Sequence, residues 1–142
     1  MRKFILSFCV ILSMFSLVAC NKENISSGIN VSVGESTKFT KEEINKAVDC
    51  VKENFKFPDS TLTDLWYDEN KSNSFIDGYL EAGNGSVNGV DDKNVIVLLS
   101  NFDVGDSGEN TVLNPNSSYT NYKWILIRDG KEKDWKVDDS GY

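Results

Sequence analysis

The segment Val95–Phe102 (VIVLLSNF) constrains the fold more than any other part of the chain. It is apolar on both of its alternating faces, whereas a strand with one solvated side alternates between apolar and polar residues. A central strand that is covered on both sides is the arrangement that buries such a sequence. The chain is therefore predicted to contain a sheet with this strand in its interior.

Three further segments have the length and composition of strands. The segment 61–68 (TLTDLWYD) precedes the central strand, and the segments 119–128 (YTNYKWILIR) and 135–138 (WKVD) follow it. The central strand and the two that follow it are predicted to form an antiparallel meander. The segments 83–94 and 103–118, which are rich in Gly, Asn and Asp, are predicted to be loops.

The connection between the last two predicted strands has two alternatives. If residues 129–130 form a two-residue type I′ turn, Trp124 lies opposite Trp135 in an aromatic ladder. If the charged segment 129–134 forms a longer loop, that pairing is shifted. The sequence leaves both alternatives open.

An amphipathic helix is predicted from Thr40 to about Phe55. Thr40 and Glu43 have the spacing of a capping box at its start. Apolar residues then recur on one face, at Ile44, Ala47, Val48, Val51 and Phe55. A second, short helix is predicted for residues 74–82, so the chain as a whole is predicted to be an α+β protein.

The N-terminus has the pattern of a signal peptide. The cationic segment Met1–Lys3 precedes the apolar run 4–18, which is shorter than the ~20 residues that a membrane-spanning helix needs. The run ends in residues 17–20 (LVAC), which resemble the lipobox of bacterial lipoproteins. That resemblance implies cleavage after Ala19 and a diacylglyceryl thioether on Cys20, which anchors the chain to the outer face of the cell membrane.

The predicted organisation has three parts. Residues 1–19 are the lipoprotein signal peptide. Residues 20–37 are rich in Asn, Ser and Gly without sustained periodicity, and are interpreted as a flexible tether. Residues 38–142 are long enough to form a single α+β domain with its own core.

The composition argues against some classes of partner and against some kinds of catalytic and metal site. The formal charge of −7 becomes more negative when Arg2 and Lys3 leave with the signal peptide, which argues against a nucleic-acid partner. The chain has no histidine, the commonest metal ligand and general base. With Cys9 removed and Cys20 lipidated, Cys50 has no partner for an intrachain disulfide and is expected to be a small core residue.

No sequence motif indicates a substrate or a reaction. The acidic pairs lie at adjacent positions, and on a strand adjacent side chains point to opposite faces; the pairs are Asp68 and Glu69, Asp91 and Asp92, and Asp138 and Asp139. The loop 103–109 carries acidic oxygens that could hold Ca²⁺, yet it departs from the spacing of an EF-hand loop. We therefore predict no catalytic residue, no metal and no cofactor.

The aromatic residues are expected in the core first. If the domain leaves an open pocket, the candidates to line it are Trp66, Tyr67, Tyr122 and Trp124.

The order of elements resembles a group of Gram-positive lipoproteins of unknown function; the pieces that carry the resemblance are FTKEEINKAVDCVKENF, TLTDLWYDENKS, NVIVLLSNF, NPNSSYTNYKWILIRDG and WKVDDSGY. These lipoproteins are similar to the cystatin-like cone of the nuclear transport factor two and ketosteroid isomerase superfamily. The resemblance implies a long N-terminal amphipathic helix packed on a curved, mainly antiparallel sheet. The isomerases use an aspartate base beside a tyrosine, for which Asp64, Tyr67 and Tyr122 are the positions to consider, although no motif links them.

The expected function is that of a membrane-anchored, extracytoplasmic binding or interaction module without catalysis. Its partners would be the membrane, through the lipid anchor, and a protein or small-molecule ligand of unknown identity. Two alternatives stay open. One is an isomerase- or hydrolase-like enzyme that uses the cone as its cavity, and the other is an inhibitor or immunity-type protein for a cationic partner.

Overall fold

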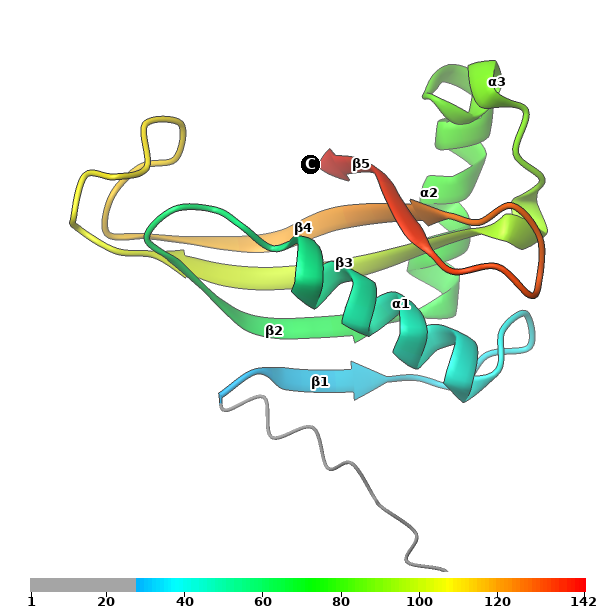
Figure 1. Cartoon of the computed structure of the whole chain (residues 1–142), viewed down its shortest axis with the longest axis horizontal. Coiled ribbons are helices and arrows are strands. Elements are labelled where there is room, and N and C mark those ends of the chain that lie inside the picture. The colour runs from blue at the N-terminus through cyan, green and yellow to red at the C-terminus, as the bar shows by residue number, and fades with distance from the viewer. Residues whose placement is uncertain (1–27) are drawn as a thin grey trace, which may run out of the picture.

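Five strands form one open sheet in the computed structural model, which describes residues 28–142 (Figure 1). The strands, in both chain and sheet order, are β1 (Asn30–Val33), β2 (Ser60–Tyr67), β3 (Val95–Val104), β4 (Ser117–Ile127) and β5 (Lys136–Gly141). The helices are α1 (Lys41–Asn54), α2 (Glu69–Ala82), α3 (Gly85–Asn88) and a 3₁₀ turn at Asp92–Asn94. Neighbouring strands are antiparallel except β1, which is parallel to β2. The predicted signal peptide, Cys20 and residues 21–27 of the predicted tether lie outside the described residues.

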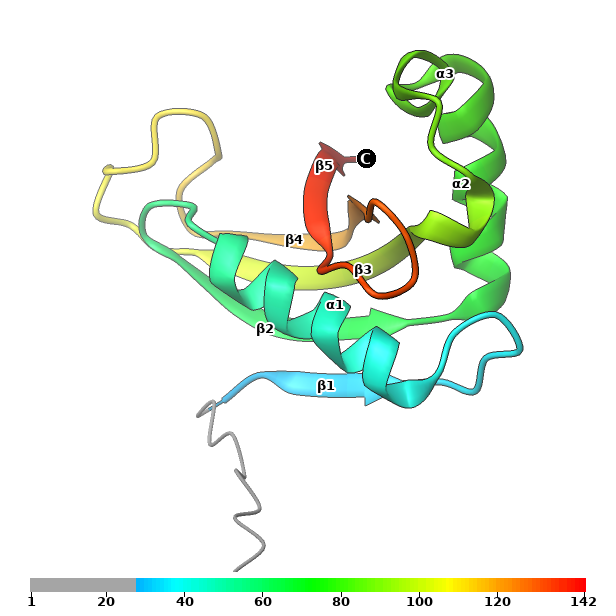
Figure 2. The same cartoon turned by 45° about the vertical axis from the view of Figure 1, so that its right-hand side comes forward.

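β3 is the central strand that its sequence predicts. Residues 95–100 are all buried, because α1 runs across one face of the sheet and α2 packs on the other (Figure 2). Leu98 contributes to the core beneath α1, and Val97 contributes to the core beneath α2. The domain is therefore an α+β fold with one helix layer on each side of a mainly antiparallel sheet.

α1 begins with the capping box predicted at Thr40. The Thr40 Oγ1 atom accepts a hydrogen bond from the Glu43 backbone N–H at 3.2 Å, and the Glu43 Oε2 atom accepts one from the Thr40 N–H at 2.8 Å. The apolar stripe of the helix is buried at Ile44, Ala47, Val48 and Val51. Val48 and Trp124 lie in the same core, which fixes α1 across the sheet.

α2 is longer than the predicted segment 74–82. It starts at Glu69, where the Asp68 carboxylate caps the helix by accepting a hydrogen bond from the Lys71 N–H at 2.9 Å. Its first turns carry polar residues and therefore lack the apolar periodicity that marks a helix in a sequence. The loop predicted for residues 83–94 also contains α3 and the 3₁₀ turn.

The register between β4 and β5 follows the longer-loop alternative. Trp124 lies opposite Ser140, so the predicted aromatic ladder of Trp124 with Trp135 is wrong. Trp135 stands just before β5, where its indole Nε1 donates a hydrogen bond to the Glu43 carbonyl oxygen at 2.9 Å. Residues 129–134 are needed to carry the chain over α1 to this position.

Residues 30–33 form strand β1, so the flexible tether predicted for residues 20–37 is wrong in this part. Val31 lies opposite Leu65 of β2, and Val33 packs against the core beneath α1. Two valines in a polar segment are too short a pattern to predict a strand. The free edge of β2 supplies the hydrogen-bond partners that the segment needs.

Removing β1 is expected to destabilise the domain. Ile29 and Val33 are partly buried against the core, and full burial of one such side chain is worth about 1.5–3 kcal/mol. A chain that starts at Gly34 should therefore melt several degrees below one that starts at Gly28. Differential scanning calorimetry measures the difference, with Ser32→Ala as a control that should change little because Ser32 is exposed. Equal melting temperatures would contradict an integral role for β1.

Candidate functional site

The aromatic residues predicted to line a pocket lie in different surroundings. Tyr67 and Trp124 are buried in the core beneath α1, with exposed fractions of 2% and 3%. Trp66 is half-buried, and it points to the opposite face of the sheet from Tyr67 because it is the adjacent residue in β2. Tyr122 is half-buried on the α1 side. The structure therefore brings Tyr122 and Trp124 together and separates Trp66 from them.

Tyr122 and Trp124 belong to a larger group of rings beyond the C-terminal end of α1. Here the chain leaves α1 and turns back towards β2 (Figure 1). Phe55 and Phe57 lie in this connection, and their neighbours include tyrosines from β4 and from the residue after β5. We call this group the aromatic face; it consists of Phe55, Phe57, Phe102, Tyr119, Tyr122, Trp124 and Tyr142.

The rings of the aromatic face lead from the core to the surface. Phe102 is fully buried, and the Tyr119 ring stacks on it with a centroid distance of 5.1 Å and an interplanar angle of 8°. The Tyr142 ring contacts Tyr119 at 6.5 Å and Tyr122 at 5.5 Å, and Tyr142 is 68% exposed. An exposed ring is thus supported by two half-buried rings.

Phe57 holds the other half of the aromatic face in place. Its ring centroid lies 5.6 Å from that of Tyr122 and 6.0 Å from that of Trp124.

Two hydroxyl contacts also orient the tyrosines. The Tyr119 hydroxyl accepts a hydrogen bond from the Asn114 backbone N–H at 2.9 Å, and the Tyr122 hydroxyl lies 3.2 Å from the Ser140 hydroxyl. The ring orientations are therefore set before any ligand arrives.

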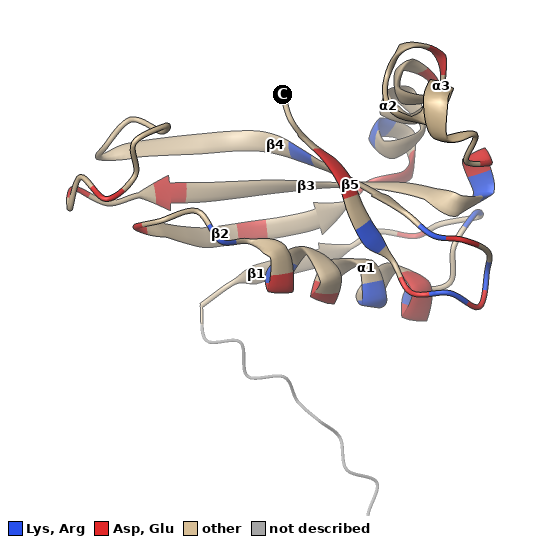
Figure 3. Ribbon diagram, turned by 45° about the horizontal axis from the view of Figure 1, so that its top comes forward, with Lys and Arg blue, Asp and Glu red and all other residues tan. Residues whose placement is uncertain are grey.

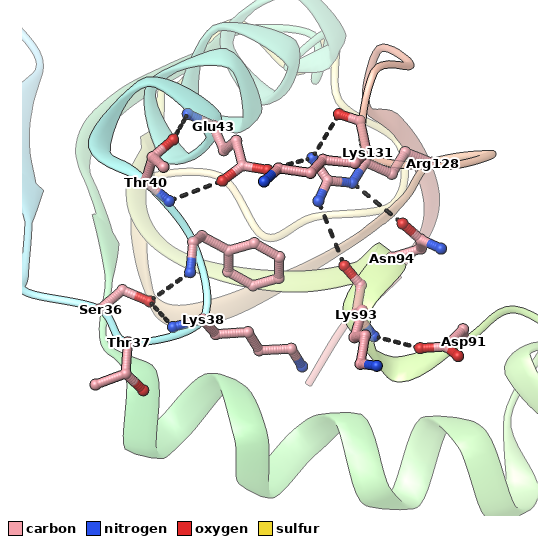
Figure 4. A pocket seen from close by; sticks show the side chains of 11 residues that line it. Ser36, Thr37, Lys38, Thr40, Glu43, Asp91, Lys93, Asn94, Arg128 and Lys131 are labelled. Carbon is pink, nitrogen blue, oxygen red and sulfur yellow. Dashed lines mark hydrogen bonds and ion pairs between the residues drawn. The ribbon is translucent and has the colours of Figure 1, made fainter.

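An open pocket of about 620 Å³ lies at the opposite end of α1 (Figure 4). Its base is Arg128, which is buried and donates to Glu43 Oε1 at 2.8 Å, to Asn94 Oδ1 at 3.3 Å and to the Lys131 carbonyl oxygen at 3.2 Å. The guanidinium also lies 4.4 Å from the centre of the Trp135 ring. None of the four aromatic residues predicted to line a pocket borders this one.

Two ion pairs lie at this pocket. Lys38 Nζ lies 3.8 Å from Asp92 Oδ2, and Arg128 bonds to Glu43. Burial by itself raises the pKa of Glu43, but hydrogen bonds from the Thr40 N–H and from Arg128 outweigh it and hold that pKa below its ordinary value. The pairs join the start of α1 to the loops after α3 and β4, so we assign this cluster a structural role.

The residues considered for isomerase-like chemistry do not form one site. Asp64 accepts hydrogen bonds from Thr63, Asn101 and Asn30, which lower its pKa, and it points away from the core to which Leu65 belongs. Tyr67 is buried on the α1 side, with its hydroxyl 3.3 Å from that of Ser36. The aspartate and the tyrosine are therefore on different faces of the sheet.

The acidic pairs stabilise the fold. Asp68 caps α2, and side-chain hydrogen bonds from Ser36 and Thr37 lower the pKa of Glu69 to about 2. Asp138 accepts a hydrogen bond from the Tyr79 hydroxyl at 2.6 Å, which ties β5 to α2.

The acidic loop 103–109 is held by hydrogen bonds to neighbouring segments. Asp103 accepts one from Ser118, and Ser107 donates to Asp59, which directly precedes β2. Within residues 28–142, Asp, Glu and Cys side chains do not gather in groups of three or more that could hold a metal ion.

Comparisons with protein-family models, with curated proteins and with solved structures find no match to this chain. In the described part of the chain, no helix has the length and apolar character needed to cross a bilayer. The candidate site therefore rests on geometry, and the aromatic face is the strongest candidate because it combines a rigid base with an exposed surface.

Proposed function

We propose that the protein is a lipid-anchored, extracytoplasmic binding module that holds its ligand on the aromatic face and does not transform it. The observation that carries the proposal is Tyr142, a largely exposed ring supported by the rings of Tyr119 and Tyr122. Tyrosines supply a large, stiff contact area at a low cost in conformational entropy. Because the supporting rings of Tyr119 and Tyr122 are already oriented, little further ordering of them opposes binding.

The finer fold proposal is a cystatin-like or nuclear transport factor two-like domain. It is supported by the amphipathic α1 lying across a mainly antiparallel sheet. In that arrangement the aromatic face lies beyond the C-terminal end of α1.

An inhibitor of a cationic partner would need a dense acidic surface. Figure 3 instead shows Asp and Glu on helices, strands and loops of the described part, interspersed with Lys and Arg. We therefore do not extend the proposal to that function.

The anchor is tested by Cys20→Ala in the host cell. We expect this variant to stay unprocessed or to leave the membrane fraction, since Cys20 is the residue to which the lipid would be attached. Cys50→Ala is the matched control, because Cys50 lies in the folded domain, and this variant should be processed and retained normally. Normal processing and membrane retention of Cys20→Ala would contradict the anchor.

The binding function is tested by co-sedimentation of the purified mature chain, residues 20–142 without lipid, with isolated cell envelopes. We expect the wild-type chain to sediment with the envelopes and Tyr142→Ala to do so at least about tenfold more weakly, a difference of about 1.4 kcal/mol. Trp66→Ala is the control, because Trp66 lies on the other face of the sheet. Binding that Tyr142→Ala leaves unchanged would show that the aromatic face is not the binding surface.

A further inference from the structure

We propose that the ligand of the aromatic face is a neutral saccharide chain. This inference rests on the proposed function and adds the chemical class of the ligand. It is drawn from the absence of charged residues in the segment 110–122, from the polar groups around the rings and from the way the rings pack.

The segment that leads into the aromatic face contains no charged side chain. Residues 110–122 (NTVLNPNSSYTNY) contain no Asp, Glu, Lys or Arg, and this is the longest such stretch in residues 28–142. Figure 3 shows the stretch as uninterrupted tan ribbon from the loop before β4 into β4 itself. In a chain with 26% charged residues, this absence favours an uncharged ligand. It disfavours nucleic acid, whose binding surfaces pair aromatic rings with a basic groove.

The polar groups beside the rings both donate and accept hydrogen bonds. They are the hydroxyls of Tyr119, Tyr122 and Ser140. A sugar ring has hydroxyls around its edge, which also donate and accept, and it has flat patches of C–H groups. An aromatic ring with neutral hydroxyls beside it matches both parts of a sugar.

The packing of the rings argues against two other ligands. A quaternary ammonium needs a cage with an empty centre, whereas the rings of Tyr122 and Tyr142 meet edge to face at 5.5 Å and fill that space themselves. A proline-rich peptide also docks on aromatic rings, but its prolines offer acceptors and no backbone donors. Such a peptide could accept hydrogen bonds from the hydroxyls of this face, but its prolines would donate none in return.

The experiment is isothermal titration calorimetry of the purified mature chain, residues 20–142 without lipid. The probes are chitohexaose, cellohexaose and maltohexaose, with decaproline as the peptide probe. We expect at least one hexasaccharide to bind, and Tyr142→Ala to weaken its binding at least about tenfold. Tyr142→Phe, which keeps the ring, and Trp66→Ala should stay within about threefold of wild type. Circular dichroism checks that each variant is folded.

The outcomes distinguish a failure of the saccharide inference from a failure of the proposed binding function. If no hexasaccharide binds while Tyr142-dependent binding to envelopes persists, the saccharide inference is wrong and the proposed function stands. Decaproline binding without saccharide binding also overturns the inference. Saccharide binding that Tyr142→Ala leaves intact places the sugar elsewhere and contradicts it. If neither envelopes nor saccharides bind, the proposed function fails as well.

Discussion

Trp124→Ala is expected to lower the free energy of unfolding by about 3–5 kcal/mol, the range found when large core aromatics are truncated. Trp124 is 3% exposed and lies beneath α1, with ring contacts to Phe55 and Phe57. Its Nε1 donates a hydrogen bond at 2.9 Å to the hydroxyl of Ser100, which is fully buried. Truncation would therefore leave a cavity and also deprive a buried hydroxyl of its donor. The midpoint of urea-induced unfolding measures the loss.

Two further variants separate the cavity from the hydrogen bond. Trp124→Phe keeps a ring but loses the donor, and it should be less destabilising than Trp124→Ala. Adding Ser100→Ala to Trp124→Phe removes the unpaired hydroxyl and should recover part of the loss. An unchanged midpoint for Trp124→Ala would show that the indole is not part of the core.

Glu43→Ala is expected to cost up to about 3–5 kcal/mol, because removing the Glu43 carboxylate leaves the charge of the buried Arg128 uncompensated. Arg128 is 5% exposed and the Glu43 side chain 15% exposed, with 2.8 Å between Nη1 and Oε1. The same substitution also removes half of the capping box of α1, which adds to the loss. Chemical denaturation measures the change.

Glu43→Gln is the matched control for the charge, since glutamine can still complete a capping box. It should therefore be less destabilising than Glu43→Ala. The double variant Glu43→Gln with Arg128→Met should be more stable than the two single changes summed, because neutral replacement of both partners is tolerated better than loss of one. Additive losses would contradict a direct coupling between the two residues.

The same pair predicts a pH dependence. Because the pKa of Glu43 is lower in the folded chain than its ordinary value, its contribution to stability is complete above the unfolded pKa of about 4.3 and is lost as the pH falls through the folded value. Wild-type protein should lose more stability than Glu43→Gln over this acidic range. Parallel losses in the two proteins would contradict the assignment.

The parts of the fold that were predictable depend on local patterns. The segment 95–102, which is apolar on both of its faces, predicts the central strand, and the spacing of Thr40 and Glu43 predicts the start of α1. β1 and the β4–β5 register depend on distant partners instead. β1 needs the free edge of β2, and the long loop 129–134 is required because Trp135 packs over α1.

The aromatic face was only partly predictable for a similar reason. The sequence indicates Tyr122 and Trp124 as candidates, but neither Phe57 nor Tyr119. Strict alternation places Tyr119 and Tyr122 on opposite faces, because they are three residues apart. The irregular pairing of β3 with β4 between Ser100 and Phe102 shifts the register, so both tyrosines face Phe102. A bulge of this kind has no clear mark in one sequence.

The most direct measurement is the chemical modification of Tyr142 by tyrosine iodination, compared between intact cells and the purified chain. Tyr142 is 68% exposed, so it should react readily when pure. A ligand on the aromatic face should protect it in cells, whereas a tyrosine introduced on the exposed side of α2 by Asn73→Tyr should react equally in both. Equal reactivity of Tyr142 in cells and in solution would contradict the proposal that the aromatic face is an occupied binding surface.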